Sequence, residues 1–82
     1  MKLIDIGFGN RLVAERILSV VHPNSLPIKN MIALAREQGL LVDATQGRKT
    51  QSVIVTDSSH VVLSYMAPER IVQAMEQEDE NV

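Results

Sequence analysis

The sequence predicts a small α+β domain, a two-layer sandwich in which two helices lie on one face of a mostly antiparallel sheet. Three observations predict this class. Short apolar segments bounded by Gly, Pro, Asn, Asp or Ser recur along the chain, as strands do. Two further segments show the apolar spacing of helices. The length of 82 residues allows one domain, which we place at residues 1–75.

The N-terminal part of the chain is predicted to be strand. Residues 2–6 alternate apolar and polar side chains, which is typical of a strand with one buried face. The segment Gly7-Phe8-Gly9-Asn10 then predicts a tight turn, with Phe8 as a packing anchor or subunit contact. Residues 11–21 are rich in aliphatic side chains and predict one or two short strands, the stronger at 16–21.

A helix is predicted to begin near Ser25, whose hydroxyl can cap it, with Pro27 in its first turn. Gly39 is placed to end the helix, because glycine readily adopts the left-handed conformation found there. The predicted buried stripe follows the spacing of one helical face and comprises Ile28, Met31, Ile32 and Ala35.

Three strands are predicted next. Residues 40–44 and 52–55 are apolar and flank a polar loop at 46–50, so we expect a tight connection between two neighbouring strands. Residues 57–59 predict a turn into a further strand at 60–65.

The chain ends in a predicted short helix and an acidic tail. Pro68 suits the first turn of that helix, whose inner side would carry Ile71, Val72 and Met75. We expect residues 76–82, which hold four acidic side chains, to be disordered and either to compete with an anionic partner or simply to solvate the domain. The total charge is −2, yet without this tail eight Lys and Arg face six Asp and Glu, a balance of about +2.

The composition limits the class of protein. Phe8 and Tyr65 are the only aromatic residues and there is no cysteine, so an aliphatic core must stabilise the fold without disulfides. We therefore expect oligomerisation. The sequence shows neither a signal peptide nor a long apolar span, which favours a cytoplasmic protein without membrane contact.

Two nucleotide-binding motifs are incomplete. Gly7-Phe8-Gly9 follows a strand, but a dinucleotide fingerprint needs glycine at position 12, which is Leu12. Lys49-Thr50 resembles the end of a P-loop, but the glycine required just before the lysine is replaced by Arg48.

Catalytic groups do not assemble into a pattern either. Ser58, Ser59 and His60 are neighbours in sequence, which indicates a polar hairpin turn rather than a nucleophile and its base. Two histidines without any cysteine are weak evidence for a metal site. We expect no enzymatic activity, no metal and no cofactor.

The loop at 46–50 is the strongest candidate site. Gly47 can adopt a positive φ at its turn, and Arg48 and Lys49 then lie at an exposed tip where an anion can reach them. Nucleic acid is the most abundant cellular polyanion, although either cation could also be a solvated surface charge. Further cations are Lys29 and Arg36 on the outer face of the first helix, and Arg11 and Arg16 near the second strand region.

Four segments of the chain carry a recognisable set of motifs. They are Ile6-Gly7-Phe8-Gly9-Asn10, Ala14-Glu15-Arg16-Ile17, Pro27-Ile28-Lys29 and Asp43-Ala44-Thr45-Gln46-Gly47-Arg48-Lys49-Thr50. Together they resemble the RemA family of bacterial regulators of extracellular-matrix genes. The resemblance extends to about Met75, and the combination of a glycine-rich turn with the later Asp-Ala-Thr block is specific.

The resemblance implies a nucleoid-associated DNA-binding transcription regulator without enzymatic activity. It implies a homo-oligomeric ring, an octamer, with duplex DNA following the basic outside of the ring. DNA-contacting roles map onto Arg48, Lys49 and Arg16, with Lys29, Arg36 and Arg11 as further candidates. Assembly or structural roles map onto Pro27, Phe8, Gly7 and Gly9.

The loop at 46–50, which we call the basic loop, and the residue after it depart from the family pattern at three positions. Gln46 replaces a common aromatic residue, and Lys49 and Gln51 replace arginines. Lysine keeps the charge but lacks the bidentate fork of arginine, so DNA affinity or target could differ. The alternative is an oligomeric binder of a small phosphorylated ligand or nucleotide at the same cations, which would need a concave pocket beside the loop.

Overall fold

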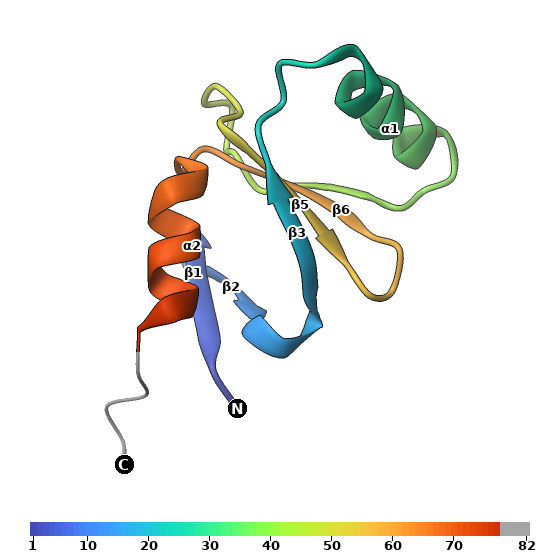
Figure 1. Ribbon diagram of the computed structural model, residues 1–82. Helices are drawn as coiled ribbons and strands as arrows, with labels where there is room; N and C mark the ends of the chain where they lie inside the picture. Colours follow the sequence, from blue (N-terminus) through green and yellow to red (C-terminus); the bar gives the residue numbers. More distant parts are fainter. Residues whose placement is uncertain (78–82) are drawn as a thin grey trace.

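The computed structural model describes residues 1–77, which fold as an α+β domain with two helices and mostly antiparallel strands, as predicted (Figure 1). Residues 78–82, most of the predicted acidic tail, lie outside the described residues. The elements in order are β1 (Leu3–Gly7), β2 (Asn10–Val13), the 3-10 turn η1 (Ala14–Arg16), β3 (Ile17–Val21), α1 (Leu26–Glu37), β4 (Leu41–Asp43), β5 (Ser52–Thr56), β6 (Val61–Ser64) and α2 (Pro68–Glu76).

The strands form two sheets. β1 and β2 make an antiparallel hairpin, and the larger sheet has the order β3-β5-β6-β4. In the larger sheet β4 pairs with β6 in parallel, while the other pairs are antiparallel. The expectation that β4 and β5 are neighbouring strands joined by a tight connection is therefore wrong. The loop between them crosses the end of β6. The sequence of a short apolar strand does not indicate which other strand it will pair with.

The two helices lie on opposite faces of the larger sheet, not on one face as predicted. Val53 and Leu63 pack on the side of α1, while Ile54 and Val62 pack on the side of α2 and β1. Figure 1 shows α1 and α2 on either side of β3, β5 and β6. The physical reason is the continuous apolar run in β5 and β6, because successive strand residues point to opposite faces and both faces must be covered.

The start and end of α1 agree with the prediction. The Ser25 hydroxyl accepts a hydrogen bond from the Ile28 amide at 3.4 Å, and Gly39 after the helix has a φ of +74°. The predicted stripe of α1 packs against the sheet.

One predicted core residue of α2 is wrong. Ile71 is fully buried and Met75 packs beside it, but Val72 is 39% exposed. The buried stripe is Ile71, Ala74 and Met75, with helical spacing that leaves Val72 at its side. Neither helix described in residues 1–77 has the length and apolarity needed to cross a bilayer.

Candidate nucleic-acid interface

The basic loop turns sharply at Gln46 and Gly47. The Arg48 amide donates to the Thr45 carbonyl at 3.0 Å, and Gln46 and Gly47 have φ values of +54° and +81°. Two successive positive φ angles define a type I′ turn, so the predicted role of Gly47 is confirmed. Arg48 and Lys49 are both exposed at this turn.

Backbone hydrogen bonds attach both ends of the loop to the end of β6. The Ala44 amide donates to the Leu63 carbonyl at 3.0 Å, and the Gln51 amide donates to the Ser64 carbonyl at 2.9 Å. The loop therefore lies over the residues that follow β6, and Tyr65 is the first of them.

Asp43 stabilises the start of the loop. Its carboxylate accepts hydrogen bonds from the Thr45 hydroxyl at 2.6 Å and from the Thr45 amide at 3.0 Å. These bonds to Thr45 lower the pKa of Asp43 below its ordinary value of 3.8, with a smaller contribution from the Arg36 cation. Thr45 is buried, so its hydroxyl and amide depend on this carboxylate for their partner.

Two fully buried serines connect this region to β1. The Ser64 hydroxyl donates to the Ile6 carbonyl at 2.8 Å and accepts from the Met66 amide at 3.0 Å. The Ser52 hydroxyl donates to the Met66 carbonyl. These bonds hold the end of β1, the start of β5 and residues 64–66 together beneath the loop.

The consequence is a stack of three side chains, which we call the Phe8–Tyr65–Arg48 stack. The Tyr65 ring centroid lies 5.0 Å from that of Phe8 and 5.5 Å from the Arg48 guanidinium carbon. Gly7 packs directly against Tyr65, and a β-carbon at this position would overlap the Tyr65 ring.

Sequence reasoning missed the role of Tyr65. The available signal was that the chain has only two aromatic residues, Phe8 and Tyr65, and that Phe8 lies in a glycine-rich turn. The turn itself is as predicted, and Phe8 is 48% exposed there.

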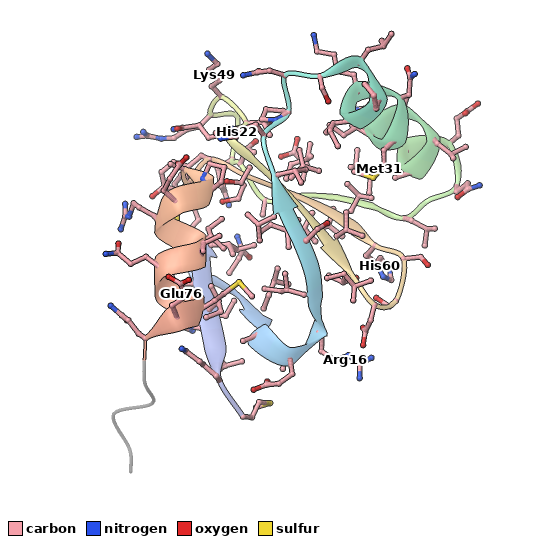
Figure 2. All side chains as sticks on the ribbon, in the orientation of Figure 1. Arg16, His22, Met31, Lys49, His60 and Glu76 are labelled. Atoms are coloured by element: carbon pink, nitrogen blue, oxygen red, sulfur yellow. The ribbon has the colours of Figure 1, made fainter. Side chains whose placement is uncertain are left out.

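Arg16 lies away from the basic loop. It precedes β3 and forms an ion pair with Asp57 at 2.9 Å, after the far end of β5. Figure 2 shows Arg16 and Lys49 at opposite ends of the larger sheet. A five-residue strand spans about 17 Å, so one subunit does not bring these two cations together.

The remaining candidate cations are also separate. Lys29 and Arg36 are exposed on α1, and Arg11 is exposed on β2, where it is paired in register with Asp5. Beside the loop, Lys49 and His22 line a polar hollow of about 140 Å³, and His22 lies 3.5 Å from Glu69.

Ser58 and His60 belong to the β5–β6 turn, as predicted. The Ser58 hydroxyl shares hydrogen bonds with Thr56 at 2.9 Å and with His60 Nδ1 at 2.8 Å. Ser59 has a φ of +69°, and its amide donates to the Thr56 carbonyl. These hydrogen bonds stabilise a tight turn.

Residues 3–75 match the model of the RemA-like family, described as extracellular matrix regulatory protein A-like. The chain belongs to this family, and the resemblance seen in its motifs is confirmed.

Two relatives, each named "Putative regulatory protein", illustrate the similarity. A protein of Alkaliphilus metalliredigens is 52% identical over 81 residues, covering 99% of this chain and 87% of the relative. A protein of Oleidesulfovibrio alaskensis is 55% identical over 78 residues, covering 95% of this chain and 93% of the relative.

Proposed function

We propose that this protein is a DNA-binding transcription regulator that contacts duplex DNA mainly through phosphates and performs no catalysis. The observation that carries the proposal is the exposed loop with Arg48 and Lys49, neither of which forms an ion pair within residues 1–77. Membership of the RemA-like family and the regulatory names of its relatives support the same proposal.

The binding unit is a ring of identical subunits, an octamer, with DNA following its basic outside. Two cations on one subunit bind phosphate weakly, whereas linked copies of the same loop raise avidity without a new kind of interaction. Phosphate contacts carry little sequence information, so selectivity would come from DNA that bends easily or from several sites in phase. The protein would then act in the cytoplasm, on the nucleoid.

Arg16 contributes a second contact in this proposal. Its exposed ion pair with Asp57 is weak enough for a DNA phosphate to replace the carboxylate. Because Arg16 and the loop lie at opposite ends of the sheet, Arg16 meets a different stretch of DNA from the loop of its own subunit.

The alternative, a small phosphorylated ligand at the same cations, has less support. The hollow beside Lys49 measures about 140 Å³ and does not include Arg48. Pockets for small-molecule ligands usually measure roughly 300–1,000 Å³. The hollow suits a single phosphate group better than a nucleotide.

The main test compares duplex DNA affinity across salt concentrations for three proteins. These are the natural protein, Arg48→Ala with Lys49→Ala, and Lys29→Ala with Arg36→Ala, which makes the same charge change on α1. We expect the loop variant to bind more weakly, with the log-log salt slope reduced by roughly 0.9 for each phosphate that is no longer neutralised. The α1 variant should be affected less, because α1 is a separate element.

Equal weakening in both variants would show that the loop contributes no more to DNA binding than Lys29 and Arg36, which are themselves candidate contacts. An unchanged loop variant would contradict the proposal. Thermal stabilisation by nucleotides, without any binding of duplex DNA, would favour the small-ligand alternative.

For Arg16, we expect Arg16→Ala to weaken DNA binding and Asp57→Asn to strengthen it, since the second change frees the guanidinium. No effect of either change would exclude Arg16 from the DNA surface.

A further inference from the structure

Phe8 is an unusual residue to find at the tip of the β1–β2 turn. Its φ is +57°, a left-handed conformation that bulky residues seldom adopt, and its side chain is 48% exposed. It is not part of either apolar core cluster. Asn or Asp would adopt the same backbone conformation more readily. Contact with Tyr65 accounts for the covered part of the phenyl ring, whereas neither core packing nor turn geometry accounts for the exposed part.

We propose that Phe8 is an apolar DNA contact that enters the minor groove beside a phosphate held by Arg48. This inference rests on the proposed function and adds a residue and a mode of contact to it. The Phe8–Tyr65–Arg48 stack is then one contact unit, in which Tyr65 positions the other two side chains.

The stack gives Phe8 and Arg48 a defined spacing. Both lie against the same Tyr65 ring, at 5.0 Å and 5.5 Å from its centroid. The ring itself is held because Ser64, the preceding residue, is bonded to the Ile6 carbonyl and to the Gln51 amide. Gly7 completes the arrangement, because the absence of a β-carbon lets the turn pack directly against the Tyr65 ring.

The minor groove fits this combination of an apolar tip and a nearby cation. It is about 6 Å wide and is bordered by the phosphates of both strands. Proteins that bind it frequently insert Phe, Leu or Ile between base steps while Arg and Lys hold the backbone, and the insertion kinks the duplex. Such a contact would make affinity depend on how easily the DNA deforms.

A subunit interface is the competing role for Phe8, and the charge beside it argues against that role. A protein partner covering Phe8 would also remove water from the Arg48 guanidinium, which forms no ion pair within the described residues. Desolvating an unpaired cation is unfavourable, whereas DNA supplies a phosphate to accept its hydrogen bonds.

The experiment compares Phe8→Ala with the natural full-length protein in three measurements. They are duplex affinity across salt concentrations, DNA bending by energy transfer between labelled ends, and mass in solution. We expect roughly tenfold weaker binding, since about half a phenylalanine side chain would no longer be buried. The salt slope should stay unchanged because every cation that faces a phosphate is retained, and the bend should decrease.

Matched variants separate the contact from general effects. Leu3→Ala removes an apolar side chain that is 50% exposed at the start of β1, close to the exposure of Phe8, and it should leave affinity and bend unchanged. Phe8→Asn suits the left-handed turn and should weaken binding to the same extent even if Phe8→Ala folds poorly. Tyr65→Phe keeps the ring and should retain binding, whereas Tyr65→Leu should lower both affinity and salt slope because Arg48 is no longer positioned.

Three results would overturn the inference. A smaller assembly for either Phe8 variant would identify Phe8 as a subunit contact. Natural affinity and bending in a folded Phe8 variant would leave the ring without a DNA role. If the natural protein binds no duplex DNA, the proposed function itself fails, which is distinguishable because the failure appears before any substitution is made.

Discussion

At the scale of single residues, the packing of Gly7 against Tyr65 decides how the basic loop is supported. Gly7 has a φ of +107° and lies where a β-carbon would overlap the Tyr65 ring. Gly9, two residues later, has a φ of +79°, but a β-carbon there would meet no heavy atom within 4 Å. The two glycines therefore share a backbone requirement, and only Gly7 has a packing requirement.

We expect Gly7→Ala to lower the free energy of unfolding more than Gly9→Ala does. The backbone conformation costs about 1–2 kcal/mol at either position, and displacing the Tyr65 ring adds roughly 1–3 kcal/mol at Gly7 alone. Urea denaturation of the two variants and the natural protein measures the difference. Equal destabilisation by both substitutions would show that the close packing of Gly7 on Tyr65 contributes nothing.

Residue exposure was largely predictable. The exposure of Arg48 and Lys49 followed from their polar surroundings between two apolar strands, and the structure confirms it. The predicted burial of Val72 was wrong, because an aliphatic residue beside the buried stripe of a helix looks like a member of that stripe until the orientation of the helix is known. Tyr65 was missed because its partners, Phe8 and Arg48, are distant in sequence.

At the scale of elements, the conformation of the basic loop depends on Asp43 as much as on the turn at Gln46 and Gly47. The carboxylate holds the Thr45 hydroxyl and amide, and Thr45 in turn accepts from the Arg48 amide. Charged acceptors form stronger hydrogen bonds than neutral ones, which explains the lowered pKa of Asp43.

Asp43→Asn should therefore lower stability at neutral pH and matter less in acid. The native pKa of Asp43 is depressed, so its contribution is present above the ordinary value of 3.8 and is lost as the pH falls through the lower native pKa. Denaturation of both proteins between pH 7 and pH 3 checks this. A stability difference that stays constant across this range, or grows in acid, would contradict the role of the charge.

Pairing between elements was less predictable than the elements themselves. The cap at Ser25, the end of α1 at Gly39 and the positions of most strands follow local rules, and the structure confirms them. The expected pairing of β4 with β5 was wrong because β6, which lies between them, comes later in the chain. A loop between two strands indicates a hairpin only when no third strand separates them.

At the scale of the whole molecule, apolar surface remains uncovered on the single chain. Leu18, Leu26, Leu34 and Val42 are 68%, 69%, 53% and 45% exposed. An open groove of about 290 Å³ lies between β2 and the β4–β6 side of the larger sheet, with Leu12, Val42 and Val62 among its lining residues. Apolar surface of this kind favours association of copies of the chain.

We expect the protein in solution to have a mass several times that of one chain. Its melting temperature should rise with protein concentration, because association stabilises the folded state by mass action. Sedimentation equilibrium and thermal denaturation over a hundredfold concentration range measure both. A single-chain mass throughout, with a constant melting temperature, would contradict the proposed ring and the avidity expected from it.

The sequence by itself determined the α+β class, the limits of the helices, the exposed cation pair and the family, because each depends on nearby residues or on motifs read in order. Only the tertiary structure decided that the helices cover opposite faces and that the basic loop crosses β6. It also decided that Phe8, Tyr65 and Arg48 meet. These features depend on which strands pair, and pairing is set by the burial of the whole chain rather than by any one segment.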